Sequence, residues 1–185
     1  GRFWAGTLNL EEKDPLGALY KIERNHSVTK MVDKVTISNG IAWSPDNRIM
    51  YYIDSPTKRV DAFDYDVESG TISNRRTVVE IPDNSGVPDG MTSDSEGMIW
   101  IAHWGGWKVS RWNPYNGKLI EVVNVPVERV TSCVFGGDNL DELYITTARR
   151  GLSKKDLRKQ PNAGGIFRYK THTKGMPTYF YDDNP

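Results

Sequence analysis

Two short motifs carry side chains suited to binding a metal ion. Asn39 lies in the stretch Ser38-Asn39-Gly40, and Asp89 lies in Pro88-Asp89-Gly90. An amide oxygen and a carboxylate are hard oxygen donors, which suit calcium or another divalent ion in an oxygen-rich site. Asn-Gly and Pro-Asp-Gly are also common turn sequences, so two ordinary turns are the competing interpretation.

The two motifs occupy the same place in an internal repeat. Asn39, Asp89 and Thr131 each open a short apolar run, which an acidic turn separates from a second run, at intervals of 50 and 42 residues. A period of about 40 to 50 residues with four short strands per unit is typical of β-propeller blades. The innermost strands of a propeller face its central channel, so the repeat predicts that Asn39 and Asp89 lie close together there.

The remaining sequence predicts the strands that position these residues. Short runs of aromatic and branched residues alternate with turn sequences about every 8 to 12 positions, which indicates an all-β chain. Alignment of residues 1–7 with 97–103 places the start of the chain on the second strand of a blade. We therefore expect a partial β-propeller of about three blades plus part of a fourth, with four antiparallel strands per blade, in segments of roughly 1–36, 37–83, 87–127 and 130–185.

A ring of this size is incomplete, because propellers typically close with about four to eight blades. We expect missing N-terminal blades, or a second chain, to complete it. The 24 basic and 24 acidic residues give zero net charge, which argues against nucleic-acid and membrane partners. Cys133 is the only cysteine of the chain, so no intrachain disulfide forms, and a cytoplasmic location is the simplest expectation.

Two further segments are candidates for contacting a substrate. His103 and Trp104 follow the end of a strand, where an imidazole and an indole could flank a pocket entrance and Trp104 could stack on a sugar ring. A satisfied strand-end histidine is the competing interpretation. The charged loop from Leu8 to Leu16 is either a lid or a surface hairpin. No Ser-His-Asp or Cys-His arrangement can be assembled around His103.

Several motifs together carry a family resemblance. They include Gly1-Arg2-Phe3-Trp4-Ala5-Gly6-Thr7, Ile37-Ser38-Asn39-Gly40, Tyr52-Ile53-Asp54-Ser55, Pro88-Asp89-Gly90-Met91, Thr131-Ser132-Cys133-Val134-Phe135-Gly136-Gly137 and Ala163-Gly164-Gly165-Ile166-Phe167. In this combination the chain resembles the regucalcin, senescence-marker and gluconolactonase family over nearly its whole length. The resemblance implies a six-bladed propeller that hydrolyses sugar lactones with one divalent metal, calcium first, with zinc, manganese and magnesium as alternatives. Firefly luciferin-regenerating proteins are relatives.

The resemblance also implies roles for individual residues. Asn39 is then a metal ligand, and Asp89 is the second ligand and the proposed general base. A glutamate of the lid contacts the substrate, which Glu11 fits best and Glu12 fits as the alternative. The remaining metal ligand, a glutamate of the first blade, and a substrate-holding arginine and asparagine are expected upstream of Gly1.

Three functions fit these expectations. The first is a metal-dependent, gluconolactonase-like lactonase, in which the metal polarises the lactone carbonyl and a carboxylate activates water. The second is a calcium-binding regulatory propeller without turnover. The third is an esterase or phosphotriesterase relative, because a polarising metal and a carboxylate do not select one ester class by themselves.

Overall fold

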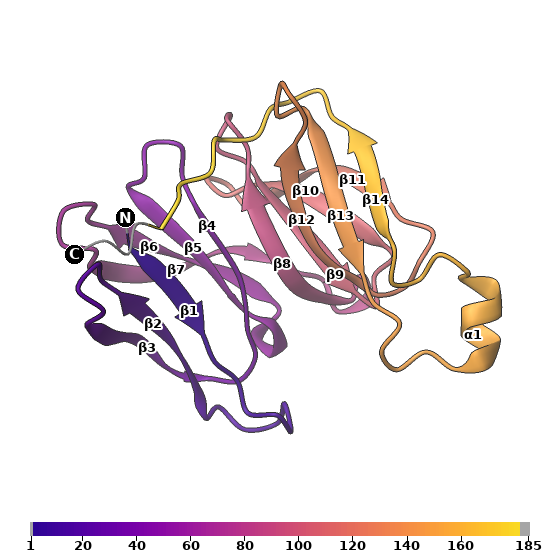
Figure 1. Ribbon diagram of the computed structural model, residues 1–185, viewed down its shortest axis with the longest axis horizontal. Helices are drawn as coiled ribbons and strands as arrows, with labels where there is room; N and C mark the ends of the chain where they lie inside the picture. Colours follow the sequence, from indigo (N-terminus) through magenta and orange to yellow (C-terminus); the bar gives the residue numbers. More distant parts are fainter. Residues whose placement is uncertain (1, 182–185) are drawn as a thin grey trace.

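The computed structural model describes residues 2–181, and its regular structure is almost entirely β (Figure 1). The all-β prediction is confirmed. Four antiparallel sheets follow one another along the chain, and within each sheet the strands neighbour one another in sequence order. This succession of sheets is consistent with a propeller-like fold. One short helix, α1 (Lys154–Lys159), interrupts the last sheet, and no helix of the described residues is long and apolar enough to cross a bilayer.

The strand bounds are as follows. The first sheet contains β1 (Phe3–Gly6), β2 (Gly17–Ile22) and β3 (Val28–Val35). The second contains β4 (Ser38–Trp43), β5 (Ile49–Asp54), β6 (Arg59–Tyr65) and β7 (Ile72–Glu80). The third contains β8 (Val87–Ser93), β9 (Ile99–Trp104), β10 (Lys108–Asn113) and β11 (Lys118–Asn124). The fourth contains β12 (Val130–Gly136), β13 (Glu142–Thr147) and β14 (Ile166–Lys170).

The hydrophobic core lies between neighbouring sheets rather than inside one layer. Apolar side chains of the second and third sheets form one cluster, and those of the third and fourth form another. Strand β9 is buried along almost its whole length because both faces of its sheet are covered. At the interface of the third and fourth sheets, Trp100 meets Phe135 edge to face, with ring centroids 5.7 Å apart.

The first strands of the second, third and fourth sheets, β4, β8 and β12, lie side by side, and glycines let them approach closely. A Cβ atom on Gly40 would lie 2.8 Å from the Asp89 carbonyl oxygen and 2.7 Å from Met91 Cβ. A Cβ atom on Gly90 would lie 2.6 Å from Ser132 Cβ. Both glycines lie inside strands and neither has a positive φ. The interpretation of these motifs as turns is therefore wrong, and the glycines serve close packing.

Strands β4, β8 and β12 share an irregularity of strand pairing at the repeat positions. Strand pairing shifts register between Ser38 and Ile41 in β4, between Pro88 and Met91 in β8, and between Val130 and Ser132 in β12. Each shift brackets one of the repeat residues Asn39, Asp89 and Thr131. Irregularities of this kind release a residue from the ladder and re-aim its side chain, and they are common beside functional sites.

The opposite ends of the strands are joined by the C-terminal segment, which runs back across the sheets (Figure 1). Gly175 N donates to Leu140 O at 2.7 Å, and Ser95 N donates to Lys174 O at 2.8 Å. Further along, the Tyr181 hydroxyl donates to the Glu23 carbonyl at 3.2 Å. The segment thus links the fourth, third and first sheets at the end away from Asn39 and Asp89.

Replacing Gly40 with alanine should separate β4 from β8. The added methyl has no room against the Asp89 carbonyl, so we expect Gly40→Ala to lower the unfolding free energy of the full-length protein by about 1 to 3 kcal/mol in denaturant titrations. Gly136→Ala is the matched control, because a Cβ atom there meets only the ring edge of Tyr144 at 3.0 Å. Equal losses for both variants would contradict the close-packing role of Gly40.

Candidate metal centre

The structure brings Asn39 and Asp89 together from two different sheets. Both side chains are half-buried, and the Asn39 side chain is near enough to the Asp89 carboxylate to lower its pKa. They meet because β4 and β8 are neighbouring first strands and because each residue lies at the irregularity of its strand. The expected proximity of the two side chains is therefore present in the structure.

The Asp89 carboxylate is held in an environment that disfavours its charge. Burial raises its pKa to about 7, and hydrogen bonds from the Gly90 backbone and the Asn39 side chain offset only part of this effect. Among the described residues, no cationic side chain contributes to the pKa of Asp89. A partly desolvated carboxylate without a cationic partner is a group that a bound cation would stabilise.

The side chain of Asn39 is fixed by a chain of hydrogen bonds. Its Nδ2 donates to Ser55 Oγ at 2.8 Å, and Ser55 Oγ donates to the Pro88 carbonyl at 2.7 Å. Ser55 begins a 3-10 turn, η1 (Ser55–Thr57), at the end of β5. This turn therefore links the Asn39 side chain to the backbone just before Asp89.

The donor set fits part of a site for a hard divalent cation. The Asn39 amide supplies a neutral oxygen and Asp89 supplies an anionic one, which are ligand types that calcium prefers. In the part of the chain that the structure describes, no group of three or more His, Cys, Asp or Glu side chains gathers around one point. The pair alone is thus an incomplete coordination shell, since calcium takes about six to eight oxygens.

Thr131, at the third repeat position, does not extend this pair with a carboxylate. Its Oγ1 lies 2.8 Å from Thr146 Oγ1, so the hydroxyl is engaged within its own sheet. The repeat position is therefore polar in three consecutive sheets, but only two of them supply an amide or carboxylate oxygen.

His103 lies elsewhere than at a pocket entrance. Its side chain is 0% exposed, and its Nε2 lies 2.5 Å from Ser110 Oγ, which also accepts a hydrogen bond from Trp112 Nε1 at 2.6 Å. Strand register explains this placement. His103 pairs with Pro88, and Asp54 pairs in the same way with Ser38 in the preceding sheet. His103 and Asp54 therefore occupy equivalent buried positions at the ends of β9 and β5, the second strands of their sheets. Full burial contradicts the expectation that His103 contacts substrate at a pocket entrance. His103 lies at a buried strand end, as the competing interpretation has it, but its Nδ1 has no hydrogen-bond partner among the described residues.

Trp104 remains accessible and has a partner that the sequence did not indicate. It is half-buried, and the guanidinium of Arg129 lies 4.9 Å from the centroid of its ring. The backbones of the two residues also pair, and Trp104 pairs with Val87, two residues before Asp89. Arg129 lies outside every motif, at the connection between two sheets, so no repeat or spacing could have indicated its contact with Trp104.

The loop from Leu8 to Leu16 lies at the same end of the strands as Asn39. Leu8 forms a bridge with Ile37, directly before β4. Glu11 is exposed, and its backbone N–H donates to Asn9 Oδ1 at 3.3 Å. Glu12 forms an ion pair with Arg150 of the β13–β14 connection, with 3.0 Å between Glu12 Oε1 and Arg150 Nη1. The loop thus reaches from the first sheet to the fourth.

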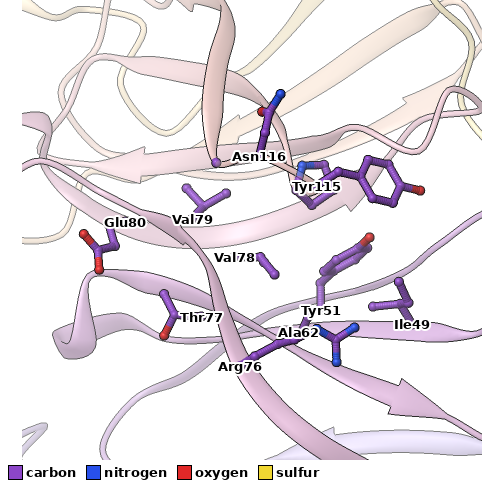
Figure 2. Close-up of a pocket in the computed structure, with 12 residues that line it drawn as sticks. Ile49, Tyr51, Ala62, Arg76, Thr77, Val78, Val79, Glu80, Tyr115 and Asn116 are labelled. Atoms are coloured by element: carbon purple, nitrogen blue, oxygen red, sulfur yellow. The ribbon is translucent and has the colours of Figure 1, made fainter.

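A cavity of about 640 Å³ lies apart from these residues, between the second and third sheets (Figure 2). Its lining includes Tyr51, Arg76 and Tyr115 and none of the predicted site residues. It therefore marks a space at an interface of two sheets and is not the candidate metal centre.

Comparisons with known proteins agree with this architecture. A family model described as "SMP-30/Gluconolactonase/LRE-like region" matches residues 1–149. The chain is 46% identical to regucalcin of Danio rerio over 184 residues and 46% identical to regucalcin of Homo sapiens over 188 residues. In both cases the match covers 98% of this chain and 62% of the relative, so the chain spans less than two thirds of the length of these regucalcins.

Solved structures show the same likeness. A luciferin-regenerating enzyme superposes with a TM-score of 0.87 at 36% identity, covering 95% of this chain and 60% of that protein. A calcium-binding protein, regucalcin, from Agrobacterium tumefaciens superposes with a TM-score of 0.90 at 28% identity, covering 95% and 59%. A gluconolactonase from Xanthomonas campestris is similar in fold, with a TM-score of 0.65 at 24% identity over 79% of this chain and 50% of that protein.

The buried His103 should make stability depend on pH. Burial lowers its pKa to about 4, helped by the charge of Lys108, so the unfolded chain binds more protons than the folded one between pH 4 and 6.5. The contribution of neutral His103 is present above pH 6.5 and is lost as pH falls toward 4, by at most about 3 kcal/mol. Asp89, with its raised pKa, contributes the opposite slope in this range.

The His103 effect is isolated by comparing two proteins. We expect the difference in unfolding free energy between the parent and His103→Gln to shrink as pH is lowered from 7 to 4, measured by denaturant unfolding of the full-length protein. A loss of stability that does not depend on pH shifts this difference by a constant and does not alter its change with pH. The pH dependence that Asp89 contributes is common to both proteins and drops out of the difference. Parallel pH profiles for the two proteins would show that His103 is not held neutral by burial.

Proposed function

Because this chain belongs to the SMP-30/gluconolactonase/LRE-like family, we propose that it is part of a metal-dependent sugar lactonase whose divalent cation is bound by Asn39 and Asp89. The observation that carries the proposal is the convergence of one amide and one half-buried carboxylate at the irregularities of two neighbouring strands. Calcium is the proposed ion, in keeping with the oxygen donors and with the relative from Agrobacterium tumefaciens that is described as a calcium-binding protein.

The proposed site is completed by residues beyond this pair. Asn39 and Asp89 leave most of the coordination shell of a calcium ion to other ligands. We propose that further blades of a six-bladed ring, or a second chain, supply these ligands and close the propeller. The four sheets of this chain would then form part of that ring, with Asn39 and Asp89 facing its channel.

The chemistry follows from the two donors. A bound divalent cation supplies a Lewis acid that polarises the lactone carbonyl. The Asp89 carboxylate is the proposed general base, which accepts a proton from the attacking water at one of its Oδ atoms. The Asn39 amide oxygen is the proposed neutral ligand beside Asp89, so the site gains an oxygen ligand without a second negative charge. Ring opening then yields the sugar acid.

The surroundings of Trp104 suit a polyhydroxylated ring. An indole face takes the apolar face of a sugar by stacking, and Arg129 holds this indole from one side at 4.9 Å. Glu11 is exposed on the lid loop and is the proposed hydrogen-bonding partner of substrate hydroxyl groups. Glu12, the alternative, is engaged with Arg150 in this structure.

Removing the charge of Asp89 tests the proposed site. Asp89→Asn in the full-length protein should lower kcat/KM for gluconolactone by about 100-fold or more, because the general base and one anionic ligand are both lost. A chelator should abolish the activity of the parent protein. Asp83→Asn removes the same charge from a carboxylate that is 96% exposed at the same end of the strands and should change kcat/KM by less than about twofold.

The outcomes separate the functions considered. Calcium binding without hydrolysis of any lactone would favour a regulatory protein without turnover. Faster turnover of phosphotriesters or other esters than of lactones would favour the esterase class. Full activity of Asp89→Asn would contradict the proposed site itself.

Removing the indole of Trp104 tests the proposed binding surface. Removing its ring should weaken substrate binding more than the chemical step, so we expect Trp104→Ala to raise KM about tenfold with a smaller change in kcat. Trp107→Ala is the matched control, because this indole lies in the β9–β10 turn that follows Trp104 and is 42% exposed. Equal KM values for the parent and Trp104→Ala would remove Trp104 from the proposed binding surface.

A further inference from the structure

We propose that Ser55 is a positioning residue that orients the Asn39 amide so that its Oδ1, and not its Nδ2, faces the bound cation. The inference rests on the proposed function, because it assigns the residue that prepares one of the two proposed ligands. It starts from the hydrogen bonds that join Asn39, Ser55 and Pro88.

The direction of these hydrogen bonds follows from counting protons. The Pro88 carbonyl can only accept, so the single hydroxyl proton of Ser55 is used in the 2.7 Å hydrogen bond to it. Ser55 Oγ can then only accept from Asn39, 2.8 Å away, and the atom facing it must carry protons. That atom is Nδ2. A flipped amide would place Oδ1 against an oxygen with no proton left to donate, which leaves two buried acceptors unpaired.

The hydrogen bond to Ser55 also decides where the amide oxygen lies. Because Nδ2 is directed to Ser55 Oγ at 2.8 Å, the other polar atom of the amide, Oδ1, is directed away from Ser55. An amide fixed in this way presents an oxygen, the atom that a hard cation binds.

Ser55 itself is firmly held. It is 3% exposed, and its backbone N–H donates to Ile37 O at 3.1 Å. Pro56 occupies the start of the η1 turn, and the Thr57 hydroxyl donates to Asp54 O at 2.7 Å. The Asp54 carboxylate accepts the backbone N–H groups of Thr36 and Ile37 at 3.1 and 2.9 Å, which fixes the connection that leads into Asn39.

The Ser55 hydroxyl has no counterpart at the equivalent positions of the next two sheets. Pairing of Ser38 with Asp54, Pro88 with His103 and Val130 with Thr147 makes Trp104 and Ala148 the counterparts of Ser55 in the next two sheets. Neither residue has a hydroxyl group. A group required for the fold of each sheet would recur at this place, whereas Ser55 occurs in the sheet that carries Asn39.

The test is a double-mutant cycle on calcium affinity, measured by calorimetry on the full-length protein. Ser55→Ala should weaken calcium binding about 10- to 100-fold, the usual effect of removing the group that orients a ligand. In the Asn39→Ala background the same change should alter affinity less than about twofold, because Ser55 acts through Asn39. Thr57→Ala, which removes a hydroxyl of the same turn that bonds only Asp54, should leave affinity unchanged.

The possible results distinguish this inference from the proposed function. Equal weakening by Ser55→Ala in both backgrounds, or none in the parent, would overturn the positioning role while leaving the metal site intact. Absence of calcium binding by the parent protein, or unchanged affinity in Asn39→Ala, would overturn the proposed site and the inference with it.

A measurement on the unmutated protein covers the case in which Ser55→Ala does not fold. In nuclear magnetic resonance spectra, added calcium should shift the Asn39 side-chain carbonyl carbon, while the Nδ2 protons stay protected from solvent exchange. Rapid exchange of those protons in the calcium-bound protein would contradict the assigned orientation.

Discussion

The close approach of β4 and β8 is the constraint on which the site depends. These strands belong to different sheets, so no ladder of backbone hydrogen bonds holds them together. They come close because Gly40 leaves room for the Asp89 carbonyl and Met91, and because Ser55 of the second sheet donates to Pro88 of the third. A side chain at position 40 would separate the two donors before any question of their chemistry arose.

Two carboxylates near the ends of β8 have contrasting environments, Asp94 fully buried and Asp89 half-buried. Asp94, just after the strand, is 0% exposed and accepts hydrogen bonds from two backbone N–H groups, Trp100 Nε1 and Arg111 Nε. Asp89 has fewer donors, no cation acting on it among the described residues, and a pKa raised by burial. The satisfied carboxylate anchors a turn that the C-terminal segment crosses, and the under-satisfied one is the residue that we propose binds the cation.

The sequence indicated the all-β class and the partnership of Asn39 with Asp89, because a repeat reports which residues occupy equivalent places. The competing interpretation of the two motifs as turns was wrong, since Asn-Gly and Asp-Gly are turn signals locally and close-packing signals only when the neighbouring strand is known. His103 was misplaced for a related reason: its burial follows from the register of β9 against β8, which one-dimensional spacing does not contain. Ser55 contacts Pro88 of the next sheet, and Arg129 contacts Trp104. Ser55 ends the motif Tyr52-Ile53-Asp54-Ser55, but a motif within one strand does not indicate which residue of another sheet it meets.

The most direct test of this account is a crystal structure of the full-length protein grown with calcium, with the ion located by its anomalous signal. The account predicts one ion about 2.3 to 2.6 Å from Asn39 Oδ1 and from an Asp89 carboxylate oxygen. An ion bound elsewhere, or an Asn39 amide whose nitrogen faces the ion, would contradict it.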